Sequence, residues 1–228
     1  MTPLDYSGVT PIVFDVETCG LPNAEFFLEP VQPAKNLVDP VKVSADIEKR
    51  TAERNERVAL DWNVGRIVAI GWWTEESGLI AHVCPTEADE TAAIEAFWLT
   101  ARHRTLVGYN IKGFDLRFLV QRSRYLGIAY PWLNFSKYDR KGVADLYLDL
   151  TFGDGTYDQG AMRRTLHAFA RRFGIAVEDE VHGKDIPALV EAGQWDDVRN
   201  HLMSDVALTL ALARKLGVIL SQREEAVV

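Results

Sequence analysis

The feature that most constrains this chain is a short apolar segment at residues 12–18 that carries two carboxylates at alternate positions. Its apolar residues are β-branched or aromatic and follow Pro11, a composition typical of a buried β-strand. Alternate residues of a strand point to the same face, so Asp15 and Glu17 are expected side by side. Two buried carboxylates repel each other and lose hydration, and a divalent cation, or a pair of them, removes that conflict most simply. The alternative is that the strand ends before Asp15 and that both acids are solvated loop residues.

The chain has 228 residues, of which 47% are hydrophobic, enough to bury a sizeable core as one domain. Its formal net charge of −8 differs from the basic balance of a protein held on duplex nucleic acid by counterion release alone. A nucleic-acid substrate is still compatible with this charge, because bound metal ions supply positive charge locally.

Nothing in the sequence indicates a membrane or an oxidising compartment. Cys19 and Cys84 fit neither a metal-binding spacing nor a disulfide framework. The N-terminal MTPLDYSGV lacks the basic and apolar regions of a signal peptide, and no apolar run approaches the roughly 18 residues of a membrane helix. These features predict a soluble, cytoplasmic protein with no membrane partner.

The order of the predicted elements indicates the fold class. The apolar segment 65–73 and the strand at 79–84 are separated by a short turn, which predicts an antiparallel hairpin. Further short strands are expected at 105–110 and 143–147, and helices at about 86–104, 114–126, 161–173, 185–193 and 195–217. The sequence therefore predicts an α/β fold whose central mixed sheet, an antiparallel hairpin edge plus parallel strands, is flanked by helices.

Residues 28–63 differ from their neighbours. Three prolines open this stretch, and a charge-rich segment with few apolar residues follows. This composition predicts a solvated helix lying across the domain surface, with Val43, Ile47, Val58 and Leu60 as its anchors. We interpret 28–63 as a surface insertion within a single domain spanning 1–228.

Asp115 is the first of three further acidic residues that bear on the site. It follows Asn110 and lies where a short strand passes into a helix, a common position for functional groups in α/β sheets. The alternative is that Asp115 only interacts favourably with the N-terminal end of the helix dipole.

His201 and Asp205 are one turn apart on the last predicted helix, so their side chains project from one face. The alternative is an exposed i,i+4 pair, although the apolar residues that follow Asp205 make an unpaired carboxylate costly there. The third acid, Asp145, has no evident chemical role, and a structural interpretation is favoured.

These motifs, taken in order, resemble a known enzyme superfamily. Asp-x-Glu on the first strand, Asn-x4-Asp before a middle helix and His-x3-Asp on the last helix are similar to the motifs of DEDD-superfamily 3′–5′ exonucleases, which share a ribonuclease-H-like fold. Residues 15–18 match the first exonuclease motif, and residues 107–115 are similar to the second motif of family-B DNA polymerase proofreading domains. Residues 183–186, Trp195 and residues 205–206 resemble the approach to the third motif in related stand-alone exonucleases, so the resemblance covers nearly the whole chain.

The third motif departs from the family pattern at one position. The subfamily with this spacing places a tyrosine four residues before the last aspartate, whereas the histidine subfamily places its histidine five residues before. Here His201 stands at the tyrosine spacing. It either orients and deprotonates the attacking water, which suits a side chain with an ordinary pKa of about 6.5, or is a replacement that weakens activity.

The resemblance implies a two-metal hydrolysis of single-stranded DNA from the 3′ end, releasing nucleoside 5′-monophosphates. The implied ligands of two Mg²⁺ or Mn²⁺ ions are Asp15, Glu17, Asp115 and Asp205, and the implied catalytic residues are these four with His201. The implied substrate contacts are Thr18, Leu21, Asn110 and Phe114.

Three other interpretations stay open. The same fold can act as an exoribonuclease, because nothing in the sequence reads a 2′-hydroxyl. The chain can be a catalytically weak nucleic-acid-binding module, although four retained acids argue against this. It can also be the exonuclease subunit of a larger assembly with a replication or repair partner.

Overall fold

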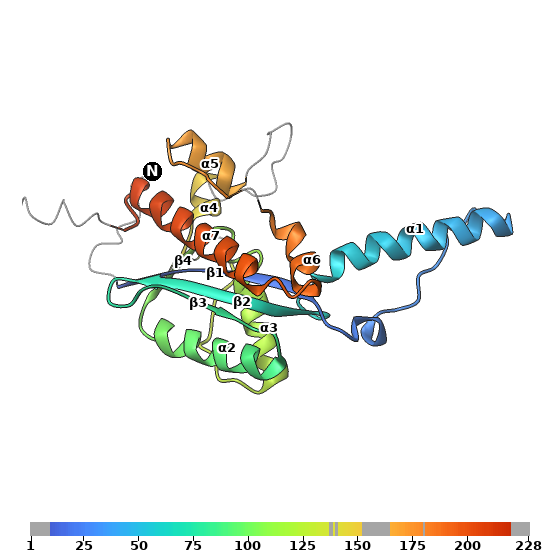
Figure 1. The fold of residues 1–228 in the computed structure, drawn as a ribbon, viewed down its shortest axis with the longest axis horizontal. Coiled ribbons are helices and arrows are strands. Elements are labelled where there is room, and N and C mark those ends of the chain that lie inside the picture. The colour runs from blue at the N-terminus through green and yellow to red at the C-terminus, as the bar shows by residue number, and fades with distance from the viewer. Residues whose placement is uncertain (1–9, 137–138, 140, 152–164, 180, 220–228) are drawn as a thin grey trace, which may run out of the picture.

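The computed structural model describes residues 10–136, 139, 141–151, 165–179 and 181–219, and its centre is one five-stranded sheet (Figure 1). The strands are β1 (Pro11–Gly20), β2 (Gly65–Thr74), β3 (Gly78–Val83), β4 (Thr105–Gly108) and β5 (Val143–Asp145), in the order β3-β2-β1-β4-β5. The pairs β1–β2 and β2–β3 are antiparallel, and the pairs β1–β4 and β4–β5 are parallel. This confirms the predicted ribonuclease-H-like arrangement of a mixed sheet with flanking helices.

Helices cover both faces of this sheet (Figure 1). On one face lie α2 (Glu87–Ala101) and α3 (Asp115–Leu126), and on the other lies α7 (Trp195–Lys215). The shorter elements are η1 (Ala24–Phe27), α4 (Leu146–Leu150), α5 (Leu166–Arg172), η2 (Gly183–Asp185) and α6 (Ile186–Glu191). Within the described residues, no helix combines the length and the apolar character needed to span a membrane.

The alternation of β1 divides the core into two layers. Ile12, Phe14 and Val16 belong to the cluster formed with α2 and α3, whereas Val13 belongs to the cluster formed with α7. Because side chains alternate along a strand, Asp15 and Glu17 share the face of Val13. Strand geometry thus directs both acids toward α7.

The helix ends follow the local sequence signals. Thr86 and Asp89 form a capping box at the start of α2, and Gly127 ends α3 in the left-handed conformation at φ 70°. Helix α2 ends at Ala101, earlier than the predicted Arg104, and His103 is left-handed at φ 62°.

Two predicted strands are shorter than expected, and in both cases a polar residue ends them. Strand β4 ends at Gly108 because Asn110 has a φ of 58°, which no strand accommodates. Strand β5 ends at Asp145, whose carboxylate caps α4 by accepting hydrogen bonds from the N–H groups of Tyr147 and Leu148. Of the helix expected at 161–173, the part at 161–164 lies outside the described residues, and α5 forms the remainder.

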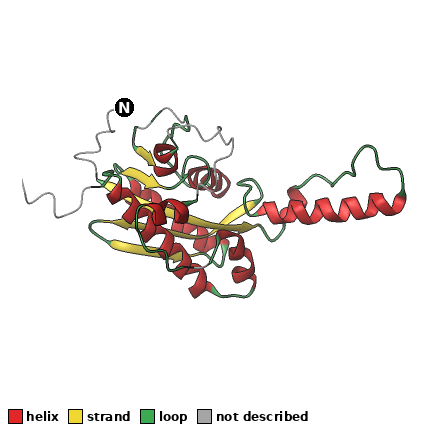
Figure 2. Cartoon of the chain, turned by 90° about the horizontal axis from the view of Figure 1, so that it is seen from above, coloured by secondary structure: helices red, strands yellow, loops and turns green. Residues whose placement is uncertain are grey.

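The prediction for residues 28–63 was right about the helix and wrong about its placement. Helix α1 (Pro40–Val58) projects away from the sheet in both views (Figures 1 and 2), and none of its residues is buried. Its few apolar side chains cannot form a continuous stripe, and the expected anchor Leu60 is 60% exposed. At its base the hydroxyl of Thr18 donates to the carbonyl oxygen of Ala59 at 2.6 Å, which ties α1 to β1.

Replacing Gly108 by alanine tests how closely β4 packs. A Cβ at this position would overlap the Ile111 side chain and lie 3.0 Å from the Phe14 carbonyl oxygen. Overpacking costs about 1–3 kcal/mol, so Gly108→Ala is expected to lower the free energy of unfolding by that amount. Urea denaturation measures the change, with Gly183→Ala as control because nothing lies within 4 Å of a Cβ there. Equal stability of the two variants would contradict the close packing.

Candidate active site

Strand β1 carries both acids of the first motif. The strand continues to Gly20, so the alternative in which it ends before Asp15 is wrong. Glu17 is 6% exposed and Asp15 is half-buried. The ladder to β2 shifts register between Glu17 and Thr18, so the two acids lie just before an irregularity in the strand pairing.

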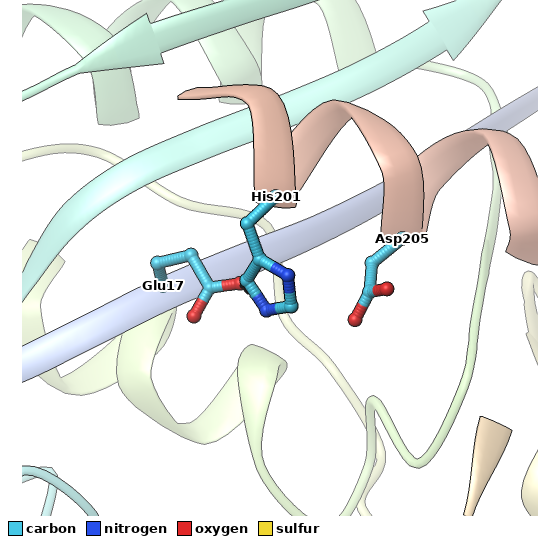
Figure 3. A group of neighbouring side chains, drawn as sticks. All are labelled: Glu17, His201 and Asp205. Atoms are coloured by element: carbon cyan, nitrogen blue, oxygen red, sulfur yellow. Dashed lines mark ion pairs between the residues drawn. The ribbon is translucent and has the colours of Figure 1, made fainter. Parts of the chain in front are cut away.

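Helix α7 brings the third motif to the same face. Gly71 pairs with Asp15, and a Cβ at Gly71 would lie 3.0 Å from the Leu202 side chain, so the bare backbone lets α7 lie close to the sheet. Figure 3 shows His201 and Asp205 projecting from one side of α7 toward Glu17 of β1. The potential ligand atoms of these three residues all lie within 4.8 Å of one another.

Asp115 enters the site from the N-terminus of α3. It is 3% exposed, and its Oδ1 accepts a hydrogen bond from the N–H of Val16 at 3.2 Å. The negative charge of Asp115 is also among the causes that raise the pKa of Asp15, after burial. The second motif is therefore joined directly to the middle of β1.

Burial and neighbouring charges raise the pKa values of three of the four acids, Asp15, Glu17 and Asp115. Burial, followed by the negative charges of neighbouring carboxylates, raises the pKa of Asp15 and of Glu17 well above their ordinary values. Burial is also the main cause that raises the pKa of Asp115, to about 7. In the described part of the chain, no lysine or arginine forms an ion pair with any of the four acids. A buried set of oxygen ligands without a cationic partner fits a hard divalent cation.

His201 lies between two carboxylates. Its side chain is 3% exposed, with Nδ1 at 2.6 Å from Oδ2 of Asp179 and Nε2 at 3.3 Å from Oε1 of Glu17. The alternative of an exposed i,i+4 pair is therefore wrong for His201. Asp205 has a separate partner, since its Oδ1 lies 3.3 Å from Nε2 of His167.

The sequence analysis missed Asp179 and His167. Burial acts to raise the pKa of Asp179, but the hydrogen bonds from His201 and from the N–H of Val181, with nearby positive charge, outweigh it and lower the pKa. No regular spacing in the sequence connects either residue to its partner on α7, because Asp179 precedes α6 and His167 lies on α5. Only the folded chain brings them to α7.

Asp145 has a structural role, as the sequence favoured. It is fully buried, and its carboxylate accepts hydrogen bonds at 2.9 Å from the N–H groups of both Asn110 and Lys112. Burial raises the pKa of Asp145, while these backbone donors counteract the rise. The side chain thereby fixes the loop that leads to Asp115.

The four residues expected to contact the substrate lie near the acids in the sequence, and they differ in burial and in their contacts. Asn110 is exposed at the turn before α3, and Phe114 is half-buried against Phe118 with ring centroids 4.9 Å apart. Leu21 is half-buried just beyond β1, whereas the hydroxyl of Thr18 is engaged by Ala59. Their contact with a substrate stays a prediction.

Comparison with known proteins shows the family to which the chain belongs. A family described as predicted 3′–5′ exonucleases related to the exonuclease domain of PolB matches residues 60–222, well over half of the chain. The chain belongs to this family of exonucleases. The matched span contains Asp115, His201 and Asp205, and the fold adds the acids of β1, which precede it.

The solved structures add support for the fold alone. The family B DNA polymerase from the hyperthermophilic archaeon Pyrobaculum calidifontis matches with a TM-score of 0.58 and 19% sequence identity. The match covers 91% of this chain and 24% of that polymerase, so the chain corresponds to about a quarter of its length. Comparison with curated proteins finds no match.

The raised pKa values predict how pH affects the stability of the chelated protein. Asp115 has a folded-state pKa of about 7, against about 3.9 in an unfolded chain. Between these values the folded state binds more protons, so the free energy of unfolding should fall as pH rises from about 5 to about 7.5. Urea denaturation in chelator measures this, and Asp115→Asn should make the fall smaller whereas Glu95→Gln, on the exposed face of α2, should not.

A free energy of unfolding that rises with pH over this range would contradict the clustering of the buried acids. Surface carboxylates whose pKa is lowered, such as Asp46 and Asp89, titrate below this pH range and do not mask the effect. A flat profile in the unsubstituted protein would also contradict it.

Proposed function

We propose that this protein is a metal-dependent 3′–5′ exonuclease that hydrolyses single-stranded DNA from its 3′ end and releases nucleoside 5′-monophosphates. Membership of the exonuclease family supports the reaction class. The observation that carries the proposal is the convergence of β1, α3 and α7 on one buried group of acids beside a buried histidine.

The residues that would hold two divalent ions, Mg²⁺ or Mn²⁺, are Asp15, Glu17, Asp115 and Asp205. Carboxylate oxygens suit these hard cations better than zinc, for which cysteine and histidine clusters are typical. Bound ions would supply a nucleophile at neutral pH and stabilise charge on the phosphate oxygens.

The chain's own residues would orient the reaction and move the proton. The Nε2 atom of His201 faces the acid cluster and is the proposed acceptor of the proton that leaves the attacking water. Its low exposure keeps bulk water away from that nitrogen. The active interpretation of His201 is favoured because a replacement that only weakened activity would not need two carboxylates around its ring.

Substrate positioning is assigned to the residues next to the acids. Thr18 follows Glu17, and Asn110 and Phe114 precede Asp115, so all three lie within a few residues of the proposed metal ligands. Leu21, just beyond β1, would contact the terminal base, and an aromatic ring such as that of Phe114 offers a stacking surface for a base.

RNA is the second candidate substrate, and it is distinguished by the assay below. Action in DNA repair, a cytoplasmic location and a replication or repair partner are part of the same proposal. A catalytically weak binding module is disfavoured, because a binding surface gains nothing from gathering four like charges, of which Glu17 and Asp115 are buried.

The decisive assay is a time course on 5′-labelled single-stranded DNA with Mg²⁺, with Mn²⁺ and with chelator. We expect a ladder that shortens from the 3′ end and that chelator abolishes. Removing a residue that hydrogen-bonds to a metal ligand typically lowers metal affinity or activity by about 10–100-fold. Asp15→Asn alters a proposed ligand itself, so we expect it to lower the cleavage rate by at least about 100-fold. Glu95→Gln is the control with an equal change of charge.

Two outcomes would contradict the proposal. Undiminished turnover in Asp15→Asn would remove the acids of β1 from the site. No cleavage of DNA or of a matching RNA with either metal would favour the binding module.

A further inference from the structure

We infer that Asp179 is a positioning residue, which holds the His201 ring so that Nε2 faces Glu17 and the acid cluster. This inference rests on the proposed role of His201 as the proton acceptor. It assigns a function to a residue that belongs to none of the three exonuclease motifs.

The contact is short and well anchored. Oδ2 of Asp179 lies 2.6 Å from Nδ1 of His201, while Oδ1 accepts a hydrogen bond from the N–H of Val181 at 2.9 Å. The two oxygens of one carboxylate thus have separate partners, one on the backbone and one on α7. The Asp179 side chain is 15% exposed, so water competes little for it.

The contact decides which ring nitrogen is available. A histidine side chain can turn about its last torsion, and a neutral ring carries its proton on either nitrogen. A carboxylate at Nδ1 favours the proton on that atom and leaves the lone pair on Nε2. In this structure Nε2 lies 3.3 Å from Oε1 of Glu17, so the ring nitrogen that Asp179 does not bind faces the acid cluster, where the proposed reaction needs it.

The cavity beside His201 shows why the ring needs the Asp179 carboxylate to hold it. A cavity of about 370 Å³ borders Asp179 and His201 and is lined further by Glu178, Val181, Asp197, Asn200 and Ser204. This polar space is large enough for water, which would hydrogen-bond to the ring if the carboxylate were removed. The ring would then be free to turn, and Nε2 would face the acids for only part of the time.

Kinetics of a double-mutant cycle test the inference. A carboxylate that orients a histidine in this way typically contributes about 10–100-fold to activity. Asp179→Asn should therefore lower kcat by that factor and leave KM for the oligonucleotide nearly unchanged. In a His201→Gln background, Asp179→Asn should have no further effect, because Asp179 acts through the ring. Glu178→Gln, an exposed acid one residue earlier, is the matched control and should keep wild-type kcat.

Nuclear magnetic resonance of the chelated protein provides a readout that does not need activity. The Nδ1–H of a ring bound to a carboxylate should give a downfield proton signal, assigned to His201 by its loss in His201→Gln. We expect the signal to disappear in Asp179→Asn and to persist in Glu178→Gln. Asp179→Glu, which keeps the carboxylate, should retain part of both the signal and kcat. If Asp179→Asn fails to fold, Asp179→Ser, which also removes the carboxylate, replaces it.

The inference fails independently of the proposed function. If the protein cleaves no substrate but the signal behaves as expected, the positioning role stands and the exonuclease proposal falls. If Asp179→Asn leaves the signal and kcat unchanged, or lowers kcat equally with and without His201, the positioning role is overturned.

Discussion

The repulsion between the carboxylates that β1 carries side by side, Asp15 and Glu17, is the interaction on which the rest of the structure depends. Burying an ionised carboxylate is costly, and burying several together raises the pKa of each. The protein imposes this arrangement by strand alternation in β1, by the bare backbone of Gly71 beneath α7, and by the N–H of Val16 that binds Asp115. Such a cluster is stable only if protons or cations compensate the charge.

The charge of Glu90, another buried acid in the same protein, is compensated by a side chain. Glu90 is fully buried, yet its two oxygens lie 2.7 and 2.8 Å from nitrogens of the Arg122 guanidinium, and one also accepts from the N–H of Ile67. Here the fold provides its own cation, as a buried carboxylate requires. Around Asp15 and Glu17 the described residues provide no lysine or arginine partner, which is why we assign the compensating charge to bound metal ions.

Much of the fold and site could be predicted from local patterns. Alternation placed Asp15 and Glu17 on one face, helical spacing placed His201 beside Asp205, and capping signals located the start of α2 and the end of α3. These patterns are reliable because they reflect backbone geometry within a few residues. The placement of α1 was missed because its few apolar residues do not indicate where, or whether, the helix packs.

The partners of His201 and Asp205 could not be predicted for a different reason. Asp179 and His167 reach α7 through the packing of α5 and of the chain before α6, and no spacing rule connects them to it. Asp145 carried a similar ambiguity, because its hydrogen bonds to Asn110 and Lys112 join segments that are distant in sequence. Contacts of this kind depend on the whole fold.

Calorimetric titration of the chelator-treated protein with Mn²⁺ tests the central claim most directly. Titrations near pH 7 in buffers with different ionisation enthalpies measure the number of protons released. The account predicts binding with net proton release, because a cation displaces the protons that the raised pKa values of Asp15, Glu17 and Asp115 retain. Absence of binding, or binding without proton release, would contradict the account.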